Sequence, residues 1–380
     1  MLAITNATLV MHDHYIPDGV LLVREGKIAS FGPAGRLAVP ENAKVLDVHH
    51  ALVGPGFVDI HTHADDRNFF WDDPEKVASY HLAQGTTTVL AATYMALGQE
   101  ELLSAIRILR AAMTDGSCPN LAGLYMEGPY LNPKFGCDKE HCPWAGEIRE
   151  EDYQPVIDAA WDIARAWSLA PERKGIRAFV EAVRRKNPNA VFTVAHSEAE
   201  PEEIEPLIPL GLKIGTHHTN ATGTIQKYPE VRGVCVDEVV NYRPEIYAEQ
   251  ICDGVGIHVD PYMLRLVRKI KGDDRIILIS DAYAADGPVP PGYDGVTDIN
   301  FDHTGEIAGS KLTLNVACRN YMKHTGASPV VVFRMAAENP ARAVGFKDRG
   351  KIAEGLRADL VVTDYLMNIE HVILKGELLR

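Results

Sequence analysis

Two histidines, His61 and His63, stand one residue apart at the end of the apolar run Gly56–Ile60. In a β-strand, residues i and i+2 point to the same face, so the two imidazole rings converge on one point. Neutral imidazole is the commonest metal ligand in proteins, and the pair therefore predicts a hydrolytic metal centre. A second pair, His12 and His14, has the same spacing but lies among polar and turn-forming residues, so we interpret it as a solvated turn. From their spacing alone, His61 and His63 are about equally well interpreted as metal ligands or as structural residues.

The middle of the chain contains the elements that would position such a centre. Apolar runs typical of strands alternate there with runs of helical spacing, which is clearest in Glu100–Met113, Ile176–Arg185 and Pro261–Ile270. The predicted strands are Phe57–His63, Thr86–Tyr94, Leu121–Glu127, Ala164–Ala170, Ala190–His196, Lys213–His217, Ile246–Cys252 and Ile276–Asp281. Eight such βα units in succession predict an α/β fold of the (β/α)8, TIM-like barrel type.

Both ends of the chain consist of short strand-like runs joined by turns, among them Val20–Val23 and His371–Leu374. Strands this short cannot bury a core separately, so we expect the two ends to pair in one small β-sandwich. The predicted domains are therefore a β-sandwich made of residues 1–55 and 347–380, and a metal-dependent barrel over residues 56–346.

Barrel enzymes carry their chemistry at the C-terminal ends of the strands. Metal-competent side chains follow the predicted strands of this chain one after another: His61, His63, Glu127, His196, His217, His258 and Asp281. Each has an ordinary explanation when it is taken alone, such as a surface acid, a loop histidine or a helix N-cap. Seven of them at the same end of one predicted barrel favour a metal site.

Composition restricts the partners and the compartment. The formal net charge of -14 argues against general binding of nucleic acid or anionic membranes, although a few local cations can hold one phosphate. Six scattered cysteines without disulfide-framework spacing, a start without a signal-peptide pattern and the lack of a long apolar run predict a cytoplasmic protein. Cys137, His141 and Cys142 resemble half of a zinc clip, but no second pair of suitable spacing exists, and an ordinary loop is the favoured interpretation.

Longer segments carry a family resemblance. The chain resembles the amidohydrolase superfamily and, within it, the N-acetylglucosamine-6-phosphate deacetylases, and the matches run in family order over almost its whole length. The matching segments are PGFVDIHTH, MEGPYLNP, LAPE, AHS, THHTNAT, DGVGIHVD, ISDA, IAGSKLTL, ENPARAVGF and GKIAEGLRADLVV. The deacetylase subgroup is indicated chiefly by MEGPY, THHTNAT and IAGSKLTL.

The resemblance implies a divalent metal, with zinc as the first expectation and iron or another transition metal as the alternative, and one or two ions per subunit. Glu127, His196 and His217 would hold the primary ion, while His61 and His63 would hold a second one, bridged through Glu127. A divalent ion lowers the pKa of water and polarises an amide carbonyl. Asp281, next to the ion, would act as general base and then as general acid, and His258 would orient the substrate or stabilise the oxyanion.

The implied reaction is the release of acetate from an amino-sugar phosphate, first of all from N-acetylglucosamine 6-phosphate. The implied substrate contacts are His141, Asn220 with Ala221, and His258. Where the family has a phosphate-holding arginine, this chain offers Lys227 or Arg232. Lysine can hold a phosphate as a point charge but lacks the two-pronged hydrogen bonding of arginine. The interpretation of Lys227 and Arg232 as solvated surface charges has about the same weight as their interpretation as phosphate ligands. The family dimerises near this phosphate site, so we expect a homodimer.

Three further departures affect the binding loops. The segment Lys134–His141 differs in register from the family pattern, His218 and Thr219 replace an apolar and an aromatic residue, and an extra Val-Gly step precedes His258. Loops of the kind of 135–144 often close as lids, and the sequence leaves both a lid and a fixed loop open here. A hydrolase acting on a different N-acyl sugar or other amide, such as a cyclic imide or an N-acyl amino acid, therefore stays an alternative. An inactive sugar-phosphate sensor is the more distant one, because no expected ligand is missing.

Overall fold

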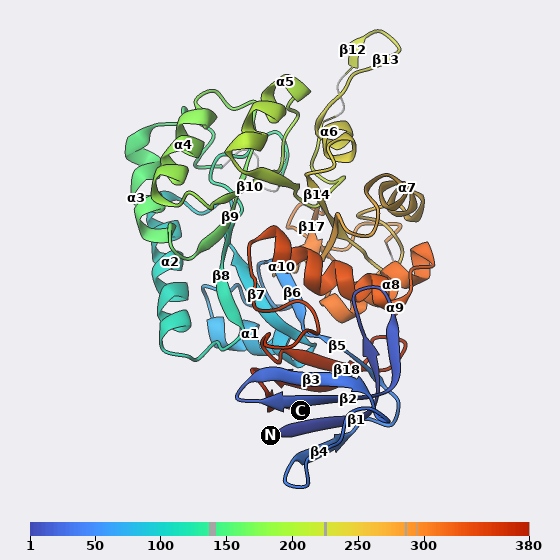
Figure 1. Cartoon of the computed structure of the whole chain (residues 1–380). Helices are drawn as coiled ribbons and strands as arrows, with labels where there is room; N and C mark the ends of the chain where they lie inside the picture. The colour runs from blue at the N-terminus through green and yellow to red at the C-terminus, as the bar shows by residue number, and fades with distance from the viewer. Residues whose placement is uncertain (137–141, 224–225, 286, 294, 380) are drawn as a thin grey trace.

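The computed structural model describes residues 1–379 apart from 137–141, 224–225, 286 and 294. It consists of a helix-covered barrel and, beside it, a sheet built from the two ends of the chain (Figure 1). None of the helices in the described part is long and apolar enough to cross a membrane.

Eight parallel strands form the barrel, and each is hydrogen-bonded to the next one along the chain. They are β6 (Phe57–Thr62), β7 (Thr86–Ala92), β8 (Leu121–Met126), β9 (Ala164–Leu169), β10 (Val191–Val194), β11 (Leu212–Gly215), β14 (Tyr247–Ile251) and β15 (Ile276–Ile279). The last strand lies beside the first, where the Asp281 N–H donates to the carbonyl oxygen of His61 at 3.0 Å. The predicted (β/α)8 barrel is confirmed.

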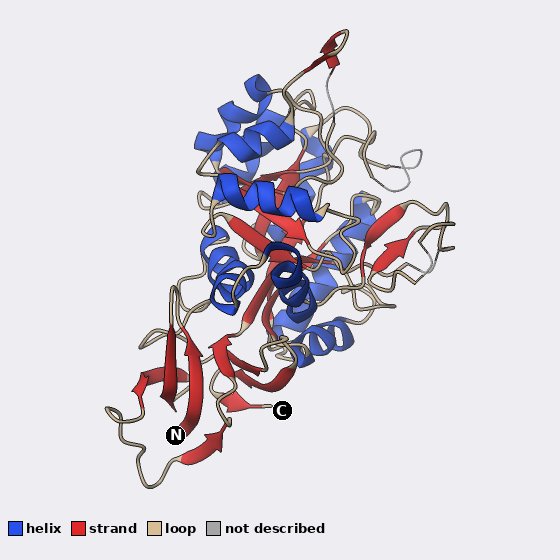
Figure 2. Cartoon of the chain, turned by 90° about the vertical axis from the view of Figure 1, so that its right-hand side faces the viewer, coloured by secondary structure: helices blue, strands red, loops and turns tan. Residues whose placement is uncertain are grey.

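Helices surround these strands in both views (Figures 1 and 2). They are α1 (Pro74–Ala83), α2 (Gln99–Thr114), α3 (Glu150–Ala160), α4 (Ile176–Lys186), α5 (Pro201–Ile204), η1 (Glu205–Leu210), α6 (Val236–Tyr242), α7 (Pro261–Lys271), α8 (Leu314–Thr325), α9 (Pro329–Phe333), η2 (Arg334–Glu338) and α10 (Asn339–Ala343). The three helices predicted from spacing correspond to α2, α4 and α7, with ends that differ by no more than one residue.

Helix α7 illustrates how local sequence determines an element. Pro261 occupies its first turn, and the Asp260 carboxylate caps it by accepting the Tyr262 N–H at 2.7 Å. Leu264 and Val267 are fully buried and belong to the large apolar core that fills the space between helices and strands. A second apolar core, which includes Ile60, Leu90, Tyr125, Ile214 and Ile277, fills the inside of the barrel.

The two chain ends share one eight-stranded sheet. Its strands are β1 (Leu2–Val10), β2 (Tyr15–Arg24), β3 (Lys27–Pro33), β4 (Lys44–Asp47), β5 (Leu52–Pro55), β18 (Leu360–Thr363), β19 (Ile369–Leu374) and β20 (Glu377–Leu378). Strand β5 joins the ends, because it pairs in parallel with β1 and antiparallel with β18. The predicted pairing of the ends is confirmed, whereas the domain boundaries 1–55, 56–346 and 347–380 stay a prediction.

Two short hairpins interrupt the βα pattern and were not expected from the sequence. Strands β12 (Gln226–Tyr228) and β13 (Val231–Arg232) form one hairpin, which projects beyond the body of the molecule in both views (Figures 1 and 2). Strands β16 (Ile299–Phe301) and β17 (Ile307–Ser310) form the other. The second one is anchored at the barrel, since the Ser310 N–H donates to the Asp281 carbonyl oxygen at 2.8 Å.

Candidate metal centre

The side chains predicted to bind metal converge at the C-terminal ends of the barrel strands. His61 lies in β6 and His63 just beyond it, Glu127 follows β8, His196 follows β10, His217 follows β11 and Asp281 follows β15. All of them except His196 are buried, and the His196 side chain is 12% exposed. The ends of different strands thus deliver one compact cluster, as the barrel fold predicts.

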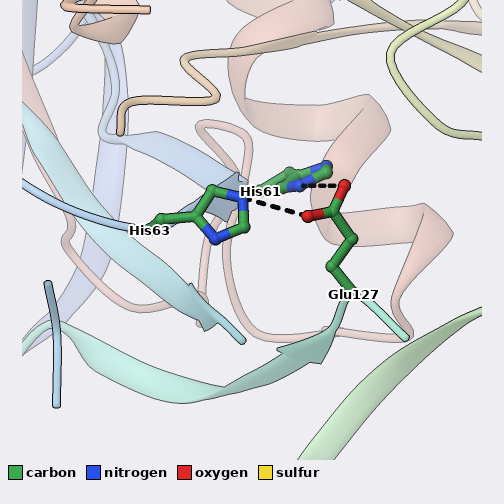
Figure 3. A group of neighbouring side chains, drawn as sticks. All are labelled: His61, His63 and Glu127. Carbon is green, nitrogen blue, oxygen red and sulfur yellow. Dashed lines mark ion pairs between the residues drawn. The ribbon is translucent and has the colours of Figure 1, made fainter. Parts of the chain in front are cut away.

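Glu127 is the centre of this cluster. Its Oε1 lies 3.5 Å from His61 Nε2 and its Oε2 lies 3.3 Å from His63 Nε2, so each carboxylate oxygen faces one ring (Figure 3). Oε1 also lies 3.1 Å from His196 Nε2 and 3.4 Å from His217 Nε2. Two groups of possible ligand atoms, His61–His63–Glu127 and Glu127–His196–His217, therefore share a single carboxylate.

Asp281 lies next to the first of these groups. Its Oδ1 is 3.4 Å from His63 Nε2 and 3.7 Å from His61 Nε2. The backbone around Asp281 is fixed on both sides, because its N–H donates to His61 and its carbonyl oxygen accepts from Ser310. A carboxylate held in this way can contact a bound ion or a water beside it.

The second ring nitrogen of three histidines is held by a neighbouring acceptor. His61 Nδ1 lies 3.2 Å from Glu249 Oε2, His196 Nδ1 lies 3.0 Å from the Phe135 carbonyl oxygen, and His217 Nδ1 lies 3.2 Å from the Asn220 carbonyl oxygen. An acceptor at Nδ1 requires the proton there and leaves the Nε2 lone pair for a metal. All three Nε2 atoms face Glu127.

Three of these strands end two residues earlier than predicted. His196, His217 and Asp281 have φ angles of 42°, 30° and 47°, which place them in the left-handed region. Residues other than glycine rarely adopt this conformation, which cannot continue a strand, and β10, β11 and β15 each end two residues before the side chain that they position. Such strain is typical of functional sites and costs about 1–3 kcal/mol per residue.

Opposite charges dominate the electrostatics of the cluster. Burial by itself would lower the pKa of His61, but Asp281 and Glu127 raise that pKa well above its ordinary value. Burial would raise the pKa of Glu127, yet His61, His196 and His217 hold it well below the usual range. The pKa of Asp281 is lowered against its burial by His61 and His63. Both carboxylates are thus ionised at neutral pH.

The donor set fits a divalent transition metal. Imidazole nitrogens and bridging carboxylates are typical ligands of zinc and of its neighbours in the first transition row. Among the described residues, His61 Nε2 is a buried atom without a hydrogen-bond partner, although Glu127 Oε1 lies only 3.5 Å away. A buried polar atom left in this way is costly, and coordination to an ion would satisfy it.

A cavity of about 260 Å³ opens onto the cluster. His258, Asn220 and Ala221 line it, as expected for substrate contacts, and Tyr94 and Tyr283 line it as well. The loop before His258 is held by Asp253, whose carboxylate accepts the His258 N–H at 2.8 Å. The structure therefore brings a polar and aromatic cavity together with the candidate metal ligands.

Other predicted site residues lie elsewhere. Arg232 is in β13, does not line the cavity, and pairs with Glu238 while its side chain stays 72% exposed. Lys227 belongs to β12, and its side chain lies outside the described residues, as do the whole of His141 and half of the segment 135–144. His12 and His14 lie in an exposed turn, which confirms their interpretation as solvated residues.

Two buried acids beside the centre were missed by the sequence analysis. Glu249, inside β14, contacts His61, and Asp59, inside β6, accepts the His61 N–H at 3.2 Å. Burial raises the pKa of Asp59 to about 7. The sequence did contain a signal for both residues, namely an acid inside an otherwise apolar strand. Burying a carboxylate is unfavourable unless it has hydrogen-bonding or charged partners.

Comparisons with known proteins identify the family. A model described as the Amidohydrolase family matches residues 52–379. The chain belongs to the amidohydrolase family. It is 26% identical to the N-acetylgalactosamine-6-phosphate deacetylase of Escherichia coli O157:H7, with 97% of each chain covered. It is 25% identical to the N-acetylglucosamine-6-phosphate deacetylase of Bacillus subtilis strain 168, with 99% of this chain and 96% of that one covered.

Solved structures of amidohydrolases have the same fold over the full length. The N-acetylglucosamine-6-phosphate deacetylase of Pasteurella multocida superposes with a TM-score of 0.85 at 26% identity and 99% coverage of both chains. A point mutant of the Mycobacterium smegmatis enzyme, in complex with N-acetyl-D-glucosamine-6-phosphate, gives a TM-score of 0.82 at 26% identity, with 99% of this chain and 98% of that one covered. The predicted family, the barrel and the class of amide hydrolase are confirmed.

Proposed function

We propose that this amidohydrolase is a metal-dependent deacetylase that removes the N-acetyl group from an amino-sugar 6-phosphate, first of all from N-acetylglucosamine 6-phosphate, and releases acetate. The observation that carries the proposal is Glu127 shared by two histidine pairs, with Asp281 Oδ1 within 3.7 Å of His61 and His63, at the base of a cavity. Relatives of full length that carry deacetylase names support the choice of substrate class.

Glu127, His196 and His217 would hold one divalent ion, and His61 and His63 would hold a second one through Glu127. Zinc is the metal that this ligand set favours. When bound, such an ion lowers the pKa of water and polarises the amide carbonyl of the substrate. The protein contributes ligands whose orientation is fixed by acceptors at Nδ1 of His61, His196 and His217.

Asp281 is assigned the proton transfers. Its Oδ1 would take a proton from the attacking water and then deliver that proton to the departing sugar amine, so one carboxylate serves as base and as acid. The lowered pKa of its carboxyl group supports the first role, because the group must be ionised before the reaction starts. The hydrogen bonds of its backbone to His61 and Ser310 keep the side chain in place through both steps.

His258 is assigned to the substrate carbonyl. Its ring lies in the cavity wall, and in the described part of the chain its Nε2 has no hydrogen-bond partner. A protonated Nε2 can donate to the carbonyl oxygen as negative charge develops there. Asn220, together with the aromatic rings of Tyr94 and Tyr283, would contact the sugar.

The phosphate and the oligomeric state are linked to the β12–β13 hairpin. The chain's two candidate phosphate-binding residues, Lys227 and Arg232, belong to this hairpin, and Arg232 does not line the cavity of its own subunit. The same hairpin carries exposed apolar side chains, since Tyr228 is 65% exposed and Val231 is 52% exposed. We propose that the protein is a homodimer in which the hairpin covers apolar surface at the interface. Four buried cysteines, Cys118, Cys235, Cys252 and Cys318, are free thiols, which supports a reducing cytoplasm.

The test is acetate release by the zinc-loaded protein from N-acetylglucosamine, N-acetylgalactosamine and N-acetylmannosamine, each with and without a 6-phosphate. The proposal predicts turnover of phosphorylated sugars, with N-acetylglucosamine 6-phosphate among the best. Turnover of N-acetylgalactosamine 6-phosphate alone would change the assigned sugar but support the deacetylase reaction. If the metal-bound protein released no acetate from any of the six substrates, the deacetylase assignment would be overturned and hydrolysis of another amide would be favoured.

A further inference from the structure

Glu249 is a buried acid at the bottom of the metal centre. It lies inside β14, its side chain is 0% exposed, and no role follows for it from the family resemblance. Its Oε2 has three neighbours: His61 Nδ1 at 3.2 Å, the backbone N–H of His217 at 3.3 Å, and the Tyr125 hydroxyl at 3.3 Å. One oxygen thus contacts both halves of the candidate centre.

The contact with His61 determines the tautomer of that ring. A carboxylate can only accept hydrogen bonds, so His61 must carry its proton on Nδ1 and direct the Nε2 lone pair to the other side. That Nε2 faces Glu127 Oε1 and has no hydrogen-bond partner among the described residues. One face of the His61 ring also stacks on the Tyr125 ring, with their centroids 4.3 Å apart.

The remaining contacts fix Glu249 itself. The Tyr125 hydroxyl, which donates to Glu249, lies 2.9 Å from the Thr216 hydroxyl and 3.2 Å from that of Thr193. These side chains come from β8, from the end of β11 and from β10, so the barrel interior sets the position of the acid. No lysine or arginine pairs with Glu249, Glu127 or Asp281 in the described part of the chain, which leaves the histidines and bound cations to balance these charges.

We propose that Glu249 is the positioning residue that makes the His61–His63 half of the centre able to hold its own ion, so that each subunit binds two divalent ions. The inference deepens the proposed metal-dependent function and rests on it for the identity of the ligands. Glu249 acts through His61, and it touches neither the substrate nor the reacting atoms.

Ion counting after equilibrium dialysis tests the inference without any substrate. The full-length protein is dialysed against zinc buffered at several free concentrations, and bound zinc is measured by mass spectrometry. We expect two ions in the wild type and a weaker second ion in Glu249→Gln, by about 10- to 100-fold in Kd, since changes of residues that support a metal ligand have effects of this size. Glu245→Gln, which neutralises an exposed acid just before β14, is the matched control and should bind like the wild type.

A double-mutant cycle with His61→Ala separates positioning from general damage. His61→Ala alone should leave one ion per subunit. In that background Glu249→Gln should change the Kd of the remaining ion by less than about threefold, because the ring on which Glu249 acts is gone. The proposal would be overturned if Glu249→Gln weakened the ion held by Glu127, His196 and His217 by the same factor with and without His61. It would also be overturned if Glu249→Gln bound two ions as tightly as the wild type.

Glu249→Asp keeps the inference testable even where Glu249→Gln folds poorly. It retains the carboxylate on a side chain shorter by one methylene, and we expect a second-ion Kd between those of the wild type and of Glu249→Gln. A second-ion Kd equal to that of Glu245→Gln would contradict the positioning role. An error in the assigned sugar would change the acetate assay but none of these ion counts, so the two failures are distinguishable.

Discussion

At the scale of single residues, the centre depends on a shared carboxylate and on the groups that orient its partners. Glu127 uses both oxygens, facing His63 with one and the other three histidines with the second. Asp281 stands beside this arrangement without being part of either ligand group. The proposed chemistry likewise gives the two carboxylates different roles, with Glu127 as the bridging ligand and Asp281 as the proton-transfer group.

A buried neutral histidine beside this site makes stability depend on pH. His81 Nε2 lies 2.8 Å from the Ala64 carbonyl oxygen, next to His63, and burial lowers the pKa of His81 to about 4. The unfolded chain, with a histidine pKa of about 6.5, binds more protons between these values, so the stability that this group contributes is present above pH 6.5 and is lost as pH falls towards 4. The loss attributable to His81 is about 3 kcal/mol in the free energy of unfolding.

Urea unfolding of the wild type and of His81→Gln at pH 7 and pH 4.5 measures this contribution. Glutamine keeps a donor near Ala64 but does not titrate, so the variant should lose less stability on acidification than the wild type. Release of metal by acid affects both proteins alike and cancels in the comparison. Parallel losses in the two proteins would show that His81 does not stay neutral in the fold.

At the scale of elements, the β16–β17 hairpin supports Asp281, the proposed proton-transfer residue, from outside the barrel. Gly309 in β17 has a φ of 61°, and a Cβ atom on it would lie 2.7 Å from the Asp281 carbonyl oxygen. The glycine is therefore required both by the left-handed backbone and by the close approach to Asp281. The hairpin and the end of β15 are thus held together, although residues 280–298 separate β15 from β16 in the sequence.

Gly309→Ala should displace Asp281 without removing any ligand. We expect a loss of about 1–2 kcal/mol in stability from the left-handed backbone. We also expect kcat to fall by about 10- to 100-fold, because a small displacement of a catalytic group has effects of this order. Kinetics and thermal unfolding check both values, with Gly146→Ala, where an added Cβ meets nothing within 4 Å, as the control. An unchanged kcat in Gly309→Ala would separate the hairpin from catalysis.

At the scale of the whole molecule, one feature extends away from the compact body. The β12–β13 hairpin projects from the body in Figure 1, and its residues Tyr228 and Val231 are exposed to solvent. Exposed apolar residues on a projecting segment are typical of an interface rather than of a free surface. The proposed homodimer accounts for them and brings the basic residues of the hairpin to an interface.

Val231→Asp should therefore shift the protein from dimer to monomer. A charge inside an apolar interface loses its solvation, and dissociation relieves that cost. Light scattering coupled to size-exclusion chromatography gives the mass directly, and Tyr242→Asp, at a residue 78% exposed in α6, is the control that should stay dimeric. A wild-type protein that elutes as a monomer would remove the homodimer from the account.

The sequence was sufficient for the barrel and for the cluster of candidate ligands, because both follow from local patterns. Apolar runs of strand length alternate with helical spacing, and a metal-competent residue follows most of the runs. The ends of the strands were predicted too late at His196, His217 and Asp281. Their left-handed φ angles are imposed by the tertiary structure and have no signal in the local sequence.

Long-range contacts account for what the sequence did not predict. Glu249 interrupts an apolar strand, and its partner His61 is 188 positions away, so only the closed barrel shows why the acid is tolerated. His218, which replaces an apolar residue of the family pattern, is buried with its Nε2 3.2 Å from Asn241 Oδ1, and it belongs to neither candidate ligand group. The projecting hairpin likewise lacks the length and alternation that would predict strands.

The most direct test of the central claim is acetate release from N-acetylglucosamine 6-phosphate by the wild type and by Asp281→Asn at equal, measured zinc content. The account predicts that the variant stays folded, binds as much zinc as the wild type, and loses turnover by about 100- to 10,000-fold, which is the usual contribution of a general acid–base group. Turnover within about tenfold of the wild type, or loss of zinc and unfolding in the variant, would contradict the role given to Asp281 in a metal-dependent deacetylase.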